Sequence, residues 1–222
     1  MLADARLVAG KDLRIERRAR VATNQVAPFA LLVLVLFAFA LDPDRGILDR
    51  ATAGLYWVAV LLSTVLAVQR AYALEAADGV PDALRLSGLD PAAVFLGKTA
   101  ALGLQLLVLE ALLLIGVTVL YSTELAGPAL LAATCLAATV GLAAAGSLYG
   151  VLAAGLRVRE TLLPLLLLPV VAPVLIGATR AFEAALAGAP GDGWPWCGLL
   201  AIFAAIYVAF GMLAFGPLME EL

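Results

Sequence analysis

The chain has 222 residues, of which 64% are hydrophobic and only 14% charged, and its formal net charge is −3. A soluble domain of this length could not bury so much apolar surface, so the composition excludes a soluble globular protein and predicts a membrane protein. Histidine is absent, which excludes histidine ligands to haem iron or to another metal. Cys135 and Cys197 lie far apart in or beside apolar blocks, and we expect buried thiols, not a disulfide framework.

The first segment, residues 1–21, is predicted to form a basic amphipathic helix in the inner membrane interface. Its apolar residues alternate with charges and are Leu2, Leu7, Val8, Leu13 and Ile15. A flexible positive tail that sets topology is the alternative. Arg17 to Arg20, the apolar run after them and Ala38-Phe39-Ala40 also resemble a secretory signal peptide. Because the basic region is long and carries its own pattern, we expect an uncleaved first span.

Six hydrophobic blocks are each long enough to cross a bilayer as a helix, since about 17–25 residues span a hydrocarbon core of about 30 Å. We place the spans at Ala22–Leu41, Ala51–Ala73, Ala92–Leu120, Gly127–Ala154, Thr161–Phe182 and Pro195–Gly216. The chain is therefore predicted to be an all-α polytopic membrane protein with a single transmembrane permease domain over residues 1–222.

The polar segment 74–91, between the second and third spans, carries more turn and cap signals than a simple reversal needs. Pro81 can start a short helix and Ser87-Gly88 can end it, while Asp90-Pro91 caps and opens the third span. We expect a short cytoplasmic coupling helix, held between two spans, that binds a soluble partner. An ordinary solvated loop is the alternative. The candidate contact residues are Val80, Leu84 and Leu86 for apolar contact, with Asp82 and Arg85 for orientation.

The chain is expected to lack its own nucleotide site. Gly97-Lys98-Thr99 resembles the end of a phosphate-binding loop, but position 92 is alanine where the G-x-x-x-x-G-K-[ST] pattern needs glycine. We interpret Lys98 as a residue at the foot of the third span that reaches toward the membrane interface. No cofactor is expected on this chain, and a partner must supply the energy for any active transport.

Glu110 is the most informative single residue within a span. It follows Lys98 by twelve residues, or roughly 18 Å along a helix, which places it well inside the bilayer. A carboxylate there faces a protein interior or a wet cavity, because exposure to lipid is too costly. Glu110 is therefore a candidate for a substrate path or a subunit contact. A neutral Glu110 that is hydrogen-bonded between helices is the alternative.

The remaining spans carry packing and kink signals. Small residues crowd the fourth span and favour close helix packing, with a dimer seam as the alternative. Three prolines, Pro164, Pro169 and Pro173, must kink or break the fifth span. A transport-related flexible element and a packed, kinked helix both fit them. The aromatic residues near the outer span ends predict an interfacial belt, formed by Tyr56, Trp57, Tyr121, Trp194 and Trp196.

The basic residues predict the orientation. With the N-terminus inside, eleven Lys and Arg residues lie on the inner side, and only Arg45, Arg50 and Arg180 lie outside. This asymmetry predicts that both termini are cytoplasmic.

Several stretches share their order and spacing with a known family. They are Lys11–Arg18, Tyr56–Leu62 with Leu66–Arg70, the set Asp78-Gly79, Leu84, Leu86, Pro91 and Lys98, and Leu162–Pro169 with Pro173–Ile176. On these residues the chain resembles the CcmB family, the haem exporter protein B subunits of cytochrome c maturation ABC transporters. The connecting segment also resembles ABC-2-type exporter permeases more widely. Ser87-Gly88 departs from the family, which often has proline near this point.

The resemblance implies a permease subunit in the bacterial inner membrane that is not itself an enzyme. It implies a second copy of the chain, a CcmA-like ATP-binding subunit that carries ATP, and CcmC-like, CcmD-like and CcmE-like haem-handling partners. ATP hydrolysis would drive either haem export, with haem as cargo, or release of a haem-loaded chaperone. The rival hypotheses are an ABC-2-type exporter of another lipid-like or drug-like cargo, a secondary transporter and a structural scaffold. The missing inverted repeat counts against a secondary transporter.

Overall fold

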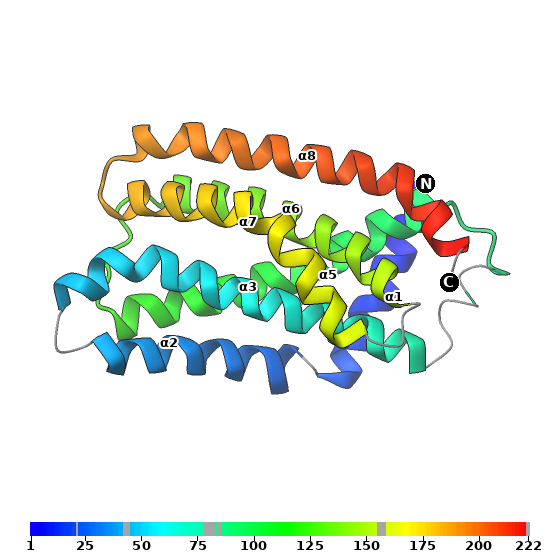
Figure 1. Ribbon diagram of the computed structural model, residues 1–222, viewed down its shortest axis with the longest axis horizontal. Coiled ribbons are helices and arrows are strands. Elements are labelled where there is room, and N and C mark those ends of the chain that lie inside the picture. The colour runs from blue at the N-terminus through cyan, green and yellow to red at the C-terminus, as the bar shows by residue number, and fades with distance from the viewer. Residues whose placement is uncertain (21, 42–44, 78–82, 84–85, 155–158, 221–222) are drawn as a thin grey trace.

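The computed structural model describes residues 1–20, 22–41, 45–77, 83, 86–154 and 159–220, and the regular elements in these ranges are all helical. The elements are α1 (Leu2–Ala19), the π-helix η1 (Ala22–Val26), α2 (Ala27–Leu41), α3 (Arg45–Ala77), α5 (Pro91–Leu120), α6 (Pro128–Ala154), α7 (Arg159–Leu186) and α8 (Pro190–Glu220). Figure 1 shows α2, α3, α5, α6 and α8 running along the long axis of the molecule, while α7 bends away from it and α1 lies at one end.

Six of these helices are long and apolar enough to cross a membrane, which confirms the predicted number of spans. Their apolar stretches are Asn24–Leu41, Gly46–Glu75, Pro91–Leu120, Pro128–Ala153, Thr161–Leu186 and Pro190–Met219. The second and sixth begin five residues before the predicted starts, at 46 instead of 51 and at 190 instead of 195. These extra turns contain polar residues such as Asp49, so hydropathy alone did not indicate that they belong to the helix.

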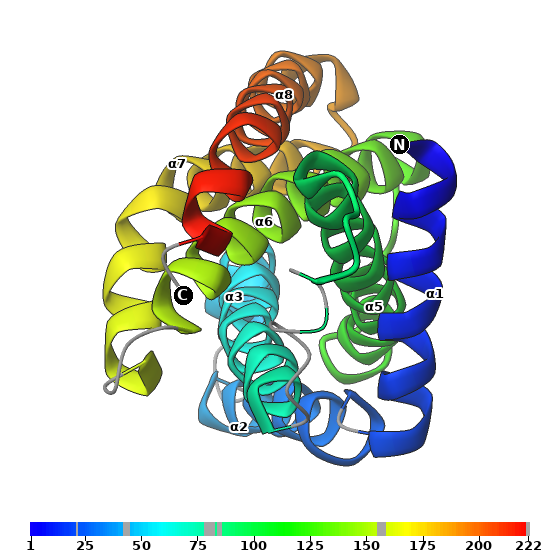
Figure 2. The ribbon, with the colours of Figure 1, turned by 90° about the vertical axis from the view of Figure 1, so that its right-hand side faces the viewer.

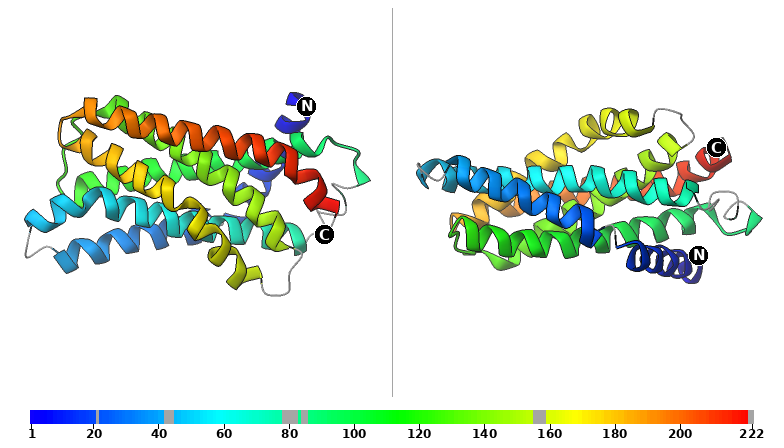
Figure 3. Two further views of the ribbon diagram at one scale, coloured as in Figure 1. Left: turned by 45° about the horizontal axis from the view of Figure 1, so that its top comes forward. Right: turned by 90° about the horizontal axis from the view of Figure 1, so that it is seen from below.

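The end of the bundle that carries α1 also holds the end of α3, the start of α5 and the end of α8 (Figures 1 and 3). We call it the α1 end. Figure 2 looks along the bundle toward this end, and α1 there lies crosswise beside α5. Val8 of α1 is buried against the bundle, whereas Leu2 and Leu7 are exposed. Whether α1 lies in a membrane interface stays a prediction.

Small residues of α6 let its neighbours pack closely. Ala143, Ala144 and Ala145 have no exposed surface. A Cβ atom on Gly146 would lie 2.8 Å from Val68 Cγ2, and one on Gly141 would lie 3.0 Å from Phe203 Cδ1. The small residues of the fourth span therefore serve packing within the bundle, the first of the two interpretations.

The three prolines of the fifth span lie inside one helix, α7, which runs unbroken from Arg159 to Leu186. Figures 1 and 3 show that α7 bends along its length and leaves the line of the other helices. Each proline removes a backbone donor and crowds the preceding turn, which explains a bend. The span is kinked and not broken.

The predicted aromatic belt is wrong for Tyr56 and Trp57. Their side chains are 0% and 1% exposed, and the Tyr56 ring stacks on Phe182 with the ring centroids 4.6 Å apart. The sequence indicated their depth in the membrane but not the face of the helix, and these rings face the bundle. Trp194 and Trp196 are 49% and 36% exposed, as a belt requires.

Tyr121 also faces inward, so the belt prediction is wrong there too. It is 4% exposed, and its hydroxyl donates a hydrogen bond to the Leu34 carbonyl oxygen at 3.0 Å. Leu34 is fully buried, and its Cδ1 would lie 3.3 Å from a Cβ on Gly116. Tyr121 thus holds α2 against the far end of α5.

Candidate functional site

Seven of the 18 residues of the predicted coupling segment, 78–82, 84 and 85, fall outside the described residues, and its described ends lie at the α1 end. Val80, Asp82, Leu84 and Arg85 belong to the part that the structure does not describe. Leu86 is helical and 89% exposed, so its apolar side chain is open to contact at the surface.

The boundary between this segment and α5 is described and matches the predicted signals. Gly88 has a φ of +67°, a conformation that glycine adopts without strain. The Asp90 carboxylate accepts a hydrogen bond from the Ala92 amide at 3.0 Å, and Pro91 occupies the first turn of α5. The capping of the third span by Asp90-Pro91 is therefore confirmed.

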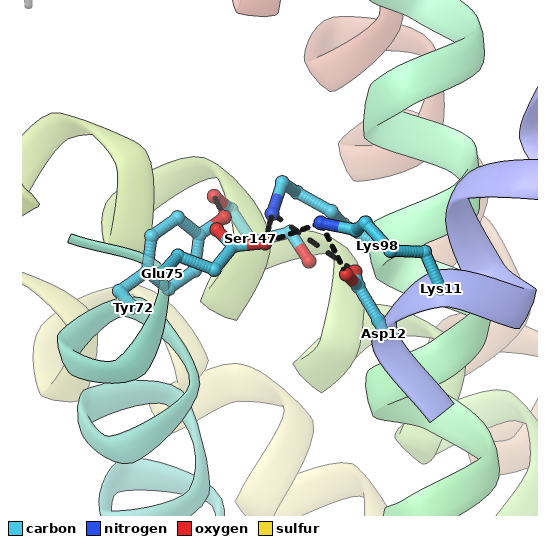
Figure 4. Close-up of polar contacts among 6 residues, drawn as sticks. All are labelled: Lys11, Asp12, Tyr72, Glu75, Lys98 and Ser147. Atoms are coloured by element: carbon cyan, nitrogen blue, oxygen red, sulfur yellow. Dashed lines mark hydrogen bonds and ion pairs between the residues drawn. The ribbon is translucent and has the colours of Figure 1, made fainter. Parts of the chain in front are cut away.

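Four charged side chains from three helices meet at the α1 end, close to both ends of this segment (Figure 4). We call Lys11, Asp12, Glu75 and Lys98 the ionic cluster. Lys11 Nζ lies 3.0 Å from Glu75 Oε1 and 2.7 Å from Asp12 Oδ1. Lys98 Nζ donates to the same Glu75 Oε1 and lies 3.9 Å from Asp12 Oδ2. One carboxylate oxygen of α3 therefore joins α1 and α5.

The ionic cluster is largely shielded from solvent, and its formal charges cancel. Glu75 and Lys98 are each 8% exposed. Burial alone would lower the pKa of Lys11, but the neighbouring Glu75 and Asp12 carboxylates raise that pKa overall. Burial raises the pKa of Asp12. Removing one member of such a buried set leaves an uncompensated charge, which typically costs about 3–5 kcal/mol.

Tyr72 connects the ionic cluster to α6. Its ring centroid lies 5.2 Å from Lys98 Nζ, which fits a cation–π contact. Its hydroxyl donates to the Ser147 carbonyl oxygen at 2.6 Å. Gly150 leaves room for the ring, since a Cβ there would lie 2.2 Å from Tyr72 Cε2. The cluster is therefore supported from α1, α3, α5 and α6 together.

Gly97-Lys98-Thr99 has a structural explanation unrelated to phosphate binding. A Cβ on Gly97 would lie 2.6 Å from both the Ala5 carbonyl oxygen and Val8 Cβ, so glycine is what allows α1 to cross α5 closely. The interpretation of Lys98 as a residue that reaches toward the interface was wrong. Its ammonium turns inward, because Glu75 and Asp12 lie there.

A narrow cavity of about 50 Å³ adjoins the ionic cluster, which is room for a few water molecules. Its polar lining residues are Asp12, Glu16, Tyr72, Glu75, Lys98, Gln105 and Ser147. The cluster was missed from the sequence because the residues that α1 contacts in it lie far along the chain: Lys11 and Glu75 are 64 residues apart, and Asp12 and Lys98 are 86 residues apart. An acidic residue two positions after the predicted second span, here Glu75, was the available signal.

Glu110 lies in a second polar site, in the middle of the bundle between α5 and α6. It is 2% exposed, and its Oε1 accepts a hydrogen bond from the Thr139 hydroxyl at 2.5 Å. The Tyr56 hydroxyl donates to the Glu110 backbone oxygen at 3.1 Å, and Cys135 Sγ lies 3.6 Å from that hydroxyl. Glu110 therefore faces the protein interior, which supports the interhelical alternative.

In the part of the chain that the structure describes, no three His, Cys, Asp or Glu side chains lie close enough together to bind a metal ion. Cys135 and Cys197 are both free thiols. What the two sites can do is hold helices in register, by charge at the α1 end and by hydrogen bonds in the middle of the bundle.

The fold and these sites define a class, a polytopic α-helical membrane protein with a buried ionic cluster beside one inter-span connection. The chain belongs to the CcmB protein family, whose family model matches residues 4–219. Heme exporter protein B of Haemophilus influenzae is 33% identical over 202 residues, which cover 89% of this chain and 87% of the relative.

Other relatives give the same result. Heme exporter protein B of Escherichia coli K12 is 34% identical over 207 residues, which cover 91% of this chain and 90% of the relative. Heme exporter protein B of Paracoccus denitrificans is 34% identical over 182 residues, with 81% and 82% coverage.

Proposed function

We propose that this chain is the membrane permease subunit of a haem-export system that serves cytochrome c maturation in the bacterial inner membrane. The observation that carries the proposal is the family match over residues 4–219, together with relatives named heme exporter protein B. The six spans support a permease role for a single domain that covers the whole chain.

The energy is proposed to come from ATP bound to a separate CcmA-like subunit. The chain's nearest approach to a phosphate-binding loop, at Gly97, is occupied by the contact with α1. The docking element is segment 74–91, with Val80, Leu84 and Leu86 as apolar contacts and Asp82 and Arg85 as orienting charges. The 89% exposure of Leu86 supports this assignment.

The proposed complex contains a second copy of this chain and CcmC-like, CcmD-like and CcmE-like partners that handle haem. Both termini lie in the cytoplasm, as the bias of Lys and Arg predicts. ATP hydrolysis then drives either haem movement or release of a haem-loaded chaperone. Glu110 is proposed to act in this cycle by keeping α5 and α6 in register through Thr139.

Co-purification tests the docking element. The double variant Leu84→Asp/Leu86→Asp is expected to insert in the membrane at normal levels yet lose the co-expressed ATP-binding subunit. Leu2→Asp is the matched control, since Leu2 is 73% exposed at the same end of the molecule and lies outside the segment. Normal retention of the ATP-binding subunit by the double variant would contradict the docking assignment.

Deletion of the chain tests the cargo class. Loss of covalently haem-labelled c-type cytochromes, restored by the wild-type chain, is the expected result. Normal cytochrome maturation with impaired export of a lipid-like or drug-like compound would favour the rival ABC-2-type exporter.

A further inference from the structure

We propose that the ionic cluster is a coupling clamp, in which Glu75 fastens α1 to the adjoining ends of α3 and α5, so that these three helices move together when a partner binds the connection between α3 and α5 (residues 78–90). The inference rests on the proposed function, because the force on the segment is taken to come from the ATP-binding subunit. Glu75, Lys98, Lys11 and Asp12 are positioning residues in this scheme, and none of them touches cargo or nucleotide.

The first support is where the clamp lies along the chain. Glu75 precedes residue 78 by three positions, and Lys98 follows residue 90 by eight, or about two helical turns. The Glu75–Lys98 ion pair therefore joins the two helices, α3 and α5, on either side of this connection. A partner that pulls on the segment would move α3 and α5 together and would not spread them apart.

The second support is the attachment of α1. Val8 packs over Gly97 of α5, while Lys11 reaches across to Glu75 of α3. The packing at Gly97 holds α1 against α5, and the ionic cluster adds a contact between α1 and α3. Because η1 begins at Ala22, only two residues after α1 reaches its cap at Arg20, a displacement of α1 is passed directly to α2.

The third support is the charge balance. Two ammonium groups share two carboxylates, and Glu75 and Lys98 are nine-tenths buried. Pulling one helix out of this set would leave a buried charge without a partner, which is strongly unfavourable. The four side chains therefore favour collective movement over stepwise separation.

The test uses the complete transport complex and the variant Glu75→Gln. We expect the ATP-binding subunit to remain bound and ATP hydrolysis to continue, while the yield of c-type cytochrome per ATP hydrolysed falls at least fivefold. Lys11→Met is expected to lower this yield by a similar factor, because it removes the ion pair between α1 and Glu75. Glu183→Gln is the matched control, since it breaks the exposed Arg180–Glu183 pair within α7, and it should leave the yield unchanged.

Hydrogen exchange of the isolated chain in nanodiscs gives a second readout that needs no partner. Glu75→Gln should raise amide exchange in α1 at least tenfold relative to Glu183→Gln, and exchange in α8 should not change. The clamp would be overturned if Glu75→Gln showed the same amide exchange in α1 as the wild type, or the same yield per ATP in the complex.

The outcomes also separate the clamp from the proposed function. If Leu84→Asp/Leu86→Asp retains the ATP-binding subunit, the docking assignment fails, whereas the exchange result still decides whether α1 is clamped. If Glu75→Gln releases the ATP-binding subunit, the cluster acts on docking and the clamp is wrong.

Discussion

Two polar regions interrupt the apolar interior of this molecule, and they are built differently. At the α1 end, Lys11, Asp12, Glu75 and Lys98 satisfy one another by charge. In the middle of the bundle, the carboxyl group of Glu110 has a neutral partner, the Thr139 hydroxyl. A charge-paired site fails when one charge is removed, whereas a hydrogen-bonded site tolerates any side chain that keeps the acceptor. The same substitution should therefore have unequal effects at the two sites.

Charge reversal at Glu75 should have the largest effect. Glu75→Lys places three ammonium groups around Asp12, and we expect a loss of about 3–5 kcal/mol of stability, as for a broken buried ion pair. Thermal unfolding of the purified chain in detergent measures this effect. Glu75→Lys/Lys98→Glu should recover part of the loss, but not all of it, because Lys11 then faces the new lysine. No recovery in the double variant would mean that the site depends on shape and not on charge.

Packing between α1 and α5 should come next. Gly97→Val forces a side chain against the Ala5 backbone, and overpacking of this kind costs about 1–3 kcal/mol. Gly10→Ala is the control, because a Cβ on Gly10 meets nothing within 4 Å. Proteolysis within α1 should accelerate only in the Gly97 variant. Equal protection in both variants would show that α1 is held without this contact.

Substitutions at Glu110 test the hydrogen-bonded site in the middle of the bundle. Glu110→Ala leaves the Thr139 hydroxyl without its acceptor, and we expect a cost of about 1–3 kcal/mol. Glu110→Gln keeps an acceptor oxygen and should cost less than Glu110→Ala. Thermal unfolding of both variants measures the difference. If Gln is as harmful as Ala, the carboxylate has a role beyond hydrogen bonding, such as the substrate-path role considered from the sequence.

The smallest expected effect is at Tyr72. Tyr72→Phe loses the hydrogen bond to the Ser147 carbonyl, which is worth about 1 kcal/mol, but keeps the ring beside Lys98. Tyr72→Ala should be clearly worse, since it removes both. Chemical denaturation in mixed micelles is the measurement. Identical denaturation midpoints for Tyr72→Phe and Tyr72→Ala would show that the cation–π contact does not contribute to stability.

The number of spans and the cap at Asp90 could be predicted from the sequence, because span length and capping are local properties. The pairing of Glu75 with Lys98 could not, since it depends on how α3 and α5 meet. Tyr56 illustrates the same limit. Its depth in the membrane was readable from its position in the span, but its stacking on Phe182 was not. Lys98 was misread because its neighbour in space, Glu75, lies 23 residues away in sequence.

The most direct test compares Glu75→Gln with Glu110→Gln in one assay. Both changes replace a buried carboxylate by an amide of the same shape, and both chains should be compared at equal abundance in the membrane. Covalently haem-labelled c-type cytochrome is then quantified. The account predicts at least a fivefold loss for Glu75→Gln and less than a twofold loss for Glu110→Gln. Equal yields, or the reverse order, would contradict it.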